Sequence, residues 1–330
     1  MNIDTIRVMI EALNLKRSTL TDSSVQRYVG VINRYVKKNE MKIQNIENVF
    51  NDFEQIEKYI DEGATNSSKS KATAFVVVAD AVGVAGETLE KLRQIQEKYK
   101  LKSIDETKQD NMTPSQRENW VSHEELLDAI DKIGFIAKQK GFWRRKQVEE
   151  KPNNLFLQYV LAVLSVNYPT RNEVGNFRVA TNENHLNDKL NYLIVKKSGK
   201  MFIRLNRYKT SKKYGAISIE IDKNEVKKII RHYLKYHRTG EFLFGEELSS
   251  PDVTKNLQKI FLRVIGKKIS SGLIRSIIAT KLLENFPTVD QIRQQNNTQI
   301  NILQHSLNVS NAVYRNVNEK KNAERKYNFQ

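Results

Sequence analysis

Residues 303–314 read LQHSLNVSNAVY and place a histidine, His305, nine residues before a tyrosine, Tyr314. A phenol is a weak nucleophile at its ordinary pKa of about 10, and cationic neighbours activate it because they stabilise the phenolate. A histidine in such a place donates a hydrogen bond or moves a proton. If this segment belongs to a reactive site, we therefore expect cationic side chains elsewhere in the chain to accompany it.

Two arginines and a lysine precede this pair, each in a segment of a different kind. Arg275 lies in the sequence SSGLIRS, at the start of an apolar helical pattern, where a buried arginine needs a partner. Arg171 lies in YPTRNEV, shortly after the most apolar segment of the chain. Lys209 lies in YKTSKKYG, which we expect at or beside the turn of a β-hairpin.

Together these side chains suit phosphoryl transfer. Two arginines can hold both non-bridging oxygens of a phosphodiester and neutralise the charge that develops in the transition state. A lysine on a flexible hairpin can protonate the leaving oxygen. Because guanidinium charge can take the place that Mg²⁺ has in other enzymes, we expect no metal and no other cofactor.

Each of these residues alone has an ordinary structural explanation. Arg171 could form a surface ion pair with Glu173, and Lys209 is one of several lysines in its segment. His305 alone is most simply a structural histidine, and Tyr314 is one of 13 tyrosines. The order Arg, Lys, Arg, His, Tyr, more than any single member, favours a common site.

This order, and the spacing of His305 and Tyr314, resemble the tyrosine recombinases, also called the phage-integrase family. In that family the ending L-G-H-S precedes the tyrosine nucleophile, and LQHS at residues 303–306 matches it. The family's second arginine belongs to H-x-L-R, with which residues 272–275 align. Its first arginine belongs to a motif like T-G-x-R-x-x-E, which residues 169–173 match loosely.

The resemblance covers most of the chain and is closest at residues 268–316. Three departures mark a divergent member of the family. Gly272 stands where the family usually has a histidine, Ser276 stands where a histidine is common, and Gln304 stands where a glycine is usual. The difference at Gly272 removes one hydrogen-bonding or proton-transfer group.

The resemblance implies a site-specific DNA recombinase or integrase that cleaves and rejoins DNA through a 3′-phosphotyrosine intermediate, without metal or ATP. Tyr314 would attack the scissile phosphate, Arg171 and Arg275 would clamp it, His305 would hydrogen-bond to it, and Lys209 would protonate the leaving 5′ oxygen. The implied fold is mostly α-helical with a small antiparallel β-sheet, arranged as a two-domain, C-shaped clamp on double-stranded DNA.

Two other functions stay open at this point. A type IB DNA topoisomerase uses a similar set of residues, and it would relax supercoiled DNA without joining two defined sites. A catalytically inactive, DNA-binding relative would bind DNA in a salt-sensitive way that does not depend on the hydroxyl of Tyr314.

The chain divides into a helical N-terminal part and a larger second part. Residues 1–105 predict a helical, core-binding-like DNA-binding domain, and residues 106–118 predict a linker, with the polar stretch 102–111 as its hinge. Residues 119–330 are expected to form the catalytic domain. The resemblance implies that its tail, residues 316–330, passes to a neighbouring protomer and so assembles a homotetramer on DNA; a solvated C-terminal segment is the equal alternative.

Local patterns predict particular elements within these parts. Helical spacing occurs at residues 22–35, 46–60, 70–82 and 87–99, and an apolar helix is expected at residues 155–166. Capping-box sequences at residues 113–116 and 122–125 predict the starts of two helices. Strands are expected at residues 177–180, 192–195, 201–205 and 216–221.

The charge of the chain favours a polyanionic partner. The 330 residues hold 55 Lys and Arg against 38 Asp and Glu, a formal net charge of +17, and residues 106–330 carry 39 of those basic and 23 of those acidic residues. Solubility alone is the simpler explanation of such an excess, but double-stranded DNA is the partner that fits the residues above. The chain has no cysteine, which excludes disulfides and thiolate metal sites. Neither a signal peptide nor a membrane span is evident, so we expect an intracellular protein of a mobile element or virus, wherever its DNA is: cytoplasm, nucleoid, host nucleus or viral factory.

Overall fold

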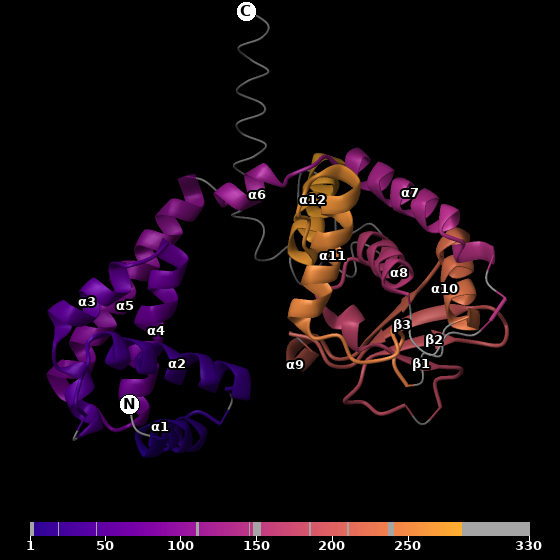
Figure 1. The fold of residues 1–330 in the computed structure, drawn as a ribbon. Helices are drawn as coiled ribbons and strands as arrows, with labels where there is room; N and C mark the ends of the chain where they lie inside the picture. The colour runs from indigo at the N-terminus through magenta and orange to yellow at the C-terminus, as the bar shows by residue number, and fades with distance from the viewer. Residues whose placement is uncertain are drawn as a thin grey trace, which may run out of the picture. The chain divides into compact units, whose positions relative to one another are not determined.

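The structure is a computed structural model, and contacts within it divide the chain into two compact units, Met1–Asn111 and Met112–Gln330 (Figure 1). The described residues are 3–18, 20–43, 45–109, 112–144, 146–147, 153–184, 186–209, 211–236 and 241–285. His305 and Tyr314 therefore lie outside them. Each unit is described by itself.

The first unit is helical throughout its described residues. Its elements are α1 (Ile3–Lys16), α2 (Asp22–Lys38), the 3₁₀ turn η1 (Ile46–Phe50), α3 (Phe53–Asp61), α4 (Thr65–Ala81) and α5 (Gly86–Gln109). Helix α4 is the centre of this unit, since α1, α2, α3 and α5 all contact it. The ring of Phe75 on α4 meets Tyr35 edge-on at a centroid distance of 5.1 Å and Tyr59 at 6.3 Å. The buried helix predicted at residues 70–82 is thus confirmed.

The helical pattern at residues 46–60 forms two elements instead of one. Asp52 separates η1 from α3, and its carboxylate accepts a hydrogen bond from the backbone N–H of Gln55 at 3.0 Å. An aspartate at this position caps the new helix, so the chain changes direction here without leaving the first backbone N–H groups of α3 unsatisfied.

The stretch predicted to be a linker is largely helical. Helix α5 continues to Gln109, and α6 occupies Pro114–Glu118. Residues 102–109 continue α5 where a hinge was expected, and the boundary between the two units follows at Asn111; the side chain of Ser103 helps to hold this part of the helix. This side chain is buried, and its hydroxyl donates to Asn66 Oδ1 at 3.2 Å. The roles expected of the two domains stay a prediction.

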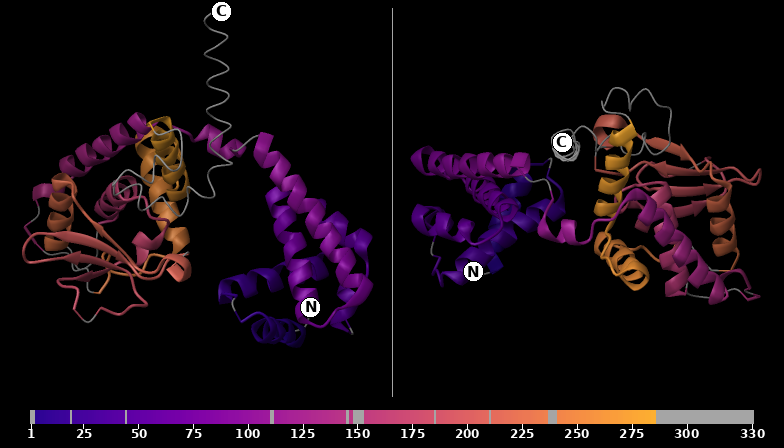
Figure 2. Two further views of the ribbon diagram at one scale, coloured as in Figure 1. Left: turned by 180° about the vertical axis from the view of Figure 1, so that it is seen from behind. Right: turned by 90° about the horizontal axis from the view of Figure 1, so that it is seen from above.

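The second unit is a bundle of helices around α8 (Asn154–Asn167), with a small sheet beside it (Figures 1 and 2). Every residue of α8 from Phe156 to Val166 is buried, as the apolar pattern predicts. Its neighbours are α7 (His123–Gln139), α10 (Asn224–Tyr236), α11 (Ser250–Ile265) and α12 (Ser271–Asn285). The shorter elements are η2 (Phe142–Arg144), η3 (Glu173–Asn176) and α9 (Ser211–Tyr214). Both predicted capping boxes are present, at the starts of α6 and α7.

The sheet contains four strands in the order β1 (Arg178–Ala180), β2 (Tyr192–Val195), β3 (Met201–Leu205) and β4 (Ile217–Glu220). All four strands lie where the sequence predicts them. Strand β3 pairs antiparallel with both β2 and β4, with Ile203 opposite Leu193 and Ile219. The β2–β3 turn uses Gly199, whose φ of +85° favours glycine.

The sheet is mixed and not purely antiparallel as expected. Strands β1 and β2 are parallel, with Arg178 opposite Tyr192 and Ala180 opposite Ile194. A two-residue hairpin turn forces antiparallel pairing, whereas the long connection 181–191 has the length to return the chain to the starting edge. The fold is therefore mostly α-helical with one small sheet, as predicted, except for the direction of this first pair.

Candidate functional site

The segment that carries Arg171 is held firmly on both sides of it. Before it, Tyr168 is buried, and its hydroxyl donates to Asp222 Oδ1 at 2.9 Å. Burial and this hydrogen bond both raise the pKa of Tyr168 above its usual range. After it, Gly175 lies so close to the loop before α11 that a Cβ there would stand 2.5 Å from both Leu248 O and Val253 Cγ2. Arg171 itself is half-buried at the end of this short loop.

Helix α12 places Arg275 against the same segment. Leu273, Ile274 and Ile277 bury the helix in the core, and Arg275 between them is half-buried. Its Nε–H donates to the backbone carbonyl of Pro169 at 3.1 Å. The partner that a buried arginine requires is therefore a main-chain oxygen two residues before Arg171.

Arg171 and Arg275 line one small pocket of about 20 Å³. The other residues of its wall are Pro169, Thr170, Glu173, Leu205, Tyr208, Ile217 and Ile219. The two arginines predicted from sequence to act together thus meet, although they lie on different elements far apart in the chain. An apolar wall from β3 and β4 lies opposite the charged groups, and it lowers the local dielectric around them.

The ordinary alternative for Arg171, an ion pair with Glu173, is not found among the described residues. No ion pair of Arg171 is found within the described ranges, and Glu173 Oε2 is buried with no hydrogen-bond partner there. Glu173 and Tyr208 line the same pocket as Arg171. Burial, and then the charges of Tyr214 and Glu173, raise the pKa of Tyr208.

Lys209 lies on the β3–β4 connection, as expected, but does not line the pocket. Its neighbour Tyr208 does, and the hydroxyl of Tyr208 donates to the carbonyl of Gly215 at 2.8 Å, which closes the connection around α9. Lys209 is exposed next to it. The connection is thus a short helix between two strands where a simple hairpin turn was predicted.

Gly272, which stands where the resembling family usually has a histidine, has open space around it. It lies exposed in the first turn of α12, and a Cβ added there would meet only Ser270 Oγ, at 3.8 Å. A larger side chain therefore has room at this position. His305 and Tyr314, the remaining two predicted site residues, lie outside the described residues, so their placement stays a prediction.

Sequence reasoning missed three residues around the pocket: Asn172, Tyr208 and the acceptor at Pro169. Asn172 hydrogen-bonds to the starts of both α11 and α12. Each of the three is adjacent or nearly adjacent to a predicted residue, which is the one signal available in the sequence. The partners of Asn172 and Pro169 lie too far along the chain for a local pattern to reveal them, whereas the partner of Tyr208, Gly215, is seven residues away.

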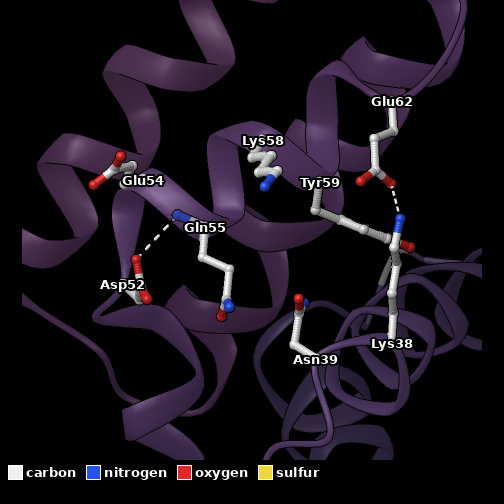
Figure 3. A pocket seen from close by; sticks show the side chains of 8 residues that line it. All are labelled: Lys38, Asn39, Asp52, Glu54, Gln55, Lys58, Tyr59 and Glu62. Atoms are coloured by element: carbon white, nitrogen blue, oxygen red, sulfur yellow. Dashed lines mark hydrogen bonds and ion pairs between the residues drawn. The ribbon is translucent and has the colours of Figure 1, made fainter.

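A larger cavity, of about 370 Å³, lies in the first unit and is no better candidate (Figure 3). Its charged groups are exposed and belong to both signs. Lys38 and Glu62 point toward each other and form an ion pair, which lowers the pKa of Glu62, while Asp52 is occupied in capping α3. Two charged groups of this cavity therefore pair with each other and a third caps a helix, whereas the pocket of Arg171 is lined by two arginines and one glutamate.

The described residues contain no cluster of three or more His, Asp or Glu residues that could hold a metal ion. None of their helices has the length and apolar character needed to cross a membrane.

Comparison with known proteins gives a distant likeness among solved structures. No protein-family model matches the chain, and no curated protein matches it. Among solved structures, the chain is similar to a crystal structure of XerA recombinase, with 12% identity and a TM-score of 0.37, over 94% of this chain and 93% of that one. A likeness at this TM-score carries no conclusion, and we therefore base the function on the residues themselves.

Proposed function

We propose that the chain is a DNA strand-cleaving and rejoining enzyme of the tyrosine-recombinase type, acting as a site-specific recombinase or integrase. The observation that supports this proposal most is the pocket shared by Arg171 and Arg275. Two guanidinium groups at one place match the two non-bridging oxygens of a phosphodiester, and the resemblance in the sequence predicts the same two residues for that task.

The chemistry proposed for this pocket follows from charge. Arg171 and Arg275 hold the scissile phosphate and stabilise the additional negative charge that develops in the transition state. The phenol oxygen of Tyr314 attacks phosphorus and loses its proton, forming a 3′-phosphotyrosine bond as the bond to the 5′ oxygen breaks. Lys209 protonates that 5′ oxygen, and His305 hydrogen-bonds to the phosphate.

Rejoining is the reverse of this step. The 5′-hydroxyl of a partner strand attacks the phosphotyrosine, the new phosphodiester forms, and Tyr314 recovers its proton. Because bond energy is conserved in the intermediate, no ATP is consumed. A lysine on an exposed connection, as Lys209 is here, can move over the pocket when DNA is bound.

The remaining parts of the proposal concern DNA and assembly. The net charge of residues 106–330 favours double-stranded DNA as the partner, with the helical N-terminal unit as a second DNA-binding domain. The tail, residues 316–330, passes between protomers and makes a homotetramer on DNA. We place the activity inside the cell, where that DNA is.

The direct test is covalent capture. Wild-type protein is incubated with a library of duplexes that carry a nick beside a possible scissile phosphate, so that cleavage releases a short fragment and does not reverse. Protein–DNA adducts that survive denaturation are isolated, and their DNA is sequenced. Tyr314→Phe should give no adduct, while the matched control Tyr236→Phe, on α10 and outside the pocket, should give the wild-type amount.

The same assay separates the alternatives. An adduct that needs Tyr314, together with joining of two defined sites, supports the recombinase. An adduct with plasmid relaxation and no joining indicates a type IB topoisomerase. Salt-sensitive binding without any adduct indicates an inactive DNA-binding relative and contradicts the proposal.

A further inference from the structure

Asn172, the residue after Arg171, hydrogen-bonds to the first residue of two different helices. Its side-chain amide group Nδ2 donates to Ser250 Oγ at 2.6 Å and to Ser250 O at 3.1 Å, both at the start of α11. Its Oδ1 accepts a hydrogen bond from Ser271 Oγ at 2.5 Å, at the start of α12. One side chain therefore connects the loop of Arg171 to both helices.

Two hydrogen bonds connect the loop of Arg171 to α12, and the bond from Ser271 to Asn172 is one of them. Ser271 and Arg275 are four residues apart on α12, so their side chains lie on one side of the helix. Ser271 binds Asn172, and Arg275 binds the carbonyl of Pro169. These two hydrogen bonds lie on either side of Arg171 in the sequence and hold its loop against the helix that carries the second arginine.

We propose that Asn172 is a positioning residue that sets the separation of the Arg171 and Arg275 guanidinium groups so that both bind one phosphodiester. This inference rests on the proposed function, since it concerns how the pair holds that group. Asn172 touches neither phosphate nor the reacting oxygen, and it acts through the two arginines.

The chemistry of the amide explains why asparagine suits this place. An amide is a donor at Nδ2 and an acceptor at Oδ1, so it can bind Ser250 and Ser271 at once, whereas a carboxylate accepts only. Ser271 is only 6% exposed, so water replaces its hydrogen bond poorly. Asn172 also anchors the turn itself, because its backbone carbonyl accepts from the N–H of Gly175 at 3.1 Å.

The test compares Asn172→Ala with Asn256→Ala in single-turnover cleavage of a nicked duplex recovered from the covalent capture. Asn256 is a matched control on α11. It also bridges elements, since its Oδ1 accepts from Gln158 Nε2 at 3.0 Å, but its hydrogen bonds, to Gln158 and Asp252, reach neither the Arg171 loop nor α12. The assay measures the rate constant of adduct formation, its amplitude and the dissociation constant of the DNA.

We expect Asn172→Ala to lower the rate constant by about 10- to 100-fold, because a displacement of about 1 Å has effects of that order. Its amplitude and DNA affinity should stay those of the wild type, since most of the binding charge is untouched. Ser271→Ala should lower the rate in the same direction, and the double variant should be no slower than Asn172→Ala. Asn256→Ala should keep the wild-type rate constant.

An unchanged rate constant in Asn172→Ala overturns the inference, and so does a loss confined to amplitude, which indicates a purely structural role. A second readout separates this outcome from failure of the proposed function. The ¹⁵N–¹H signals of the two arginine Nε groups are followed while inorganic phosphate is added. If the wild type forms no adduct, the proposed function fails. The positioning role is still supported if phosphate saturates both arginine signals together in the wild type but not in Asn172→Ala. Identical phosphate titrations of the two proteins overturn it.

Discussion

Arg275 donates from Nε to the carbonyl oxygen of Pro169 at 3.1 Å, and this hydrogen bond joins the helix of the second arginine to the segment of the first. A lysine cannot reproduce it, because a single ammonium group cannot donate to Pro169 and also offer a phosphate two parallel donors. We expect Arg275→Lys to slow adduct formation by about 10²- to 10³-fold, the usual cost of losing one donor to a developing charge.

The matched control for this substitution is Arg263→Lys, at an exposed position of α11 outside the pocket. It should form adduct at the wild-type rate. Equal rates for both variants in single-turnover assays would show that the pocket of Arg275 is not where the phosphate is held.

Gly175 should tolerate no side chain. A Cβ there would stand 2.5 Å from the backbone carbonyl of Leu248, and backbone moves aside less easily than a flexible side chain. The N–H of Leu248 also donates to the carbonyl of Gly175 at 2.9 Å, so a shift would weaken this hydrogen bond. We expect Gly175→Ala to lower the free energy of unfolding by about 1–3 kcal/mol.

Urea denaturation measures this change, with Gly272→Ala as the comparison. A Cβ at Gly272 meets nothing closer than 3.8 Å, and alanine favours a helix over glycine, so that variant should be as stable as the wild type or slightly more stable. Two variants of equal stability would mean that the loop of Arg171 does not pack on Leu248 as described.

The elements of the second unit could be predicted because their patterns are local. The apolar run of α8 and the alternation in the strands each identify an element within a few residues. The parallel pairing of β1 and β2 could not be predicted, since alternation with a period of two indicates a strand but not the direction of the neighbouring strand. The helix at residues 102–109, where a hinge was expected, includes the buried hydroxyl of Ser103, and periodicity does not reveal its partner Asn66, which lies on α4.

The candidate site divides in the same way. The sequence order of the basic residues selected Arg171 and Arg275, and the structure brings both to one pocket. Asn172 escaped notice because its partners, Ser250 and Ser271, lie about 80 and 100 residues away and belong to the starts of helices whose packing is a tertiary property. The alternative role of Arg171, an ion pair with Glu173, is not found among the described residues, although both side chains line the same pocket.

Stability should fall at alkaline pH because of Tyr159. Burial, and then the charges of Asp131 and Glu225, raise the pKa of this tyrosine to about 12, from about 10 in the unfolded chain. The folded state therefore keeps a proton that the unfolded state loses between these two values. The contribution is fully present below pH 10 and is lost as the pH rises toward 12.

Tyr159→Phe removes the titrating group and keeps the ring. We expect its free energy of unfolding, measured in urea at several pH values, to decline less steeply between pH 10 and 12 than that of the wild type. Parallel curves for the two proteins across this range would contradict the raised pKa.

Gly272→His should increase catalytic activity without loss of stability. The position is exposed in the first turn of α12, three residues before Arg275, so a side chain there would be a neighbour of Arg275 on the helix surface. An imidazole would add a hydrogen-bond donor or proton-transfer group to the site, of the kind that the resembling family carries. Since general acid–base groups contribute about 10²- to 10⁴-fold, even a poorly oriented imidazole should raise the rate of adduct formation by about tenfold.

The control is Gly272→Gln, which adds a polar side chain of similar size that does not titrate near neutral pH. It should raise the rate less than histidine does, and only Gly272→His should add a new ionisation near pH 6–7 to the pH–rate profile. If the rate and profile of Gly272→His equal those of the wild type, the group missing at this position is supplied by another residue. The departure from the family pattern would then have no cost for catalysis.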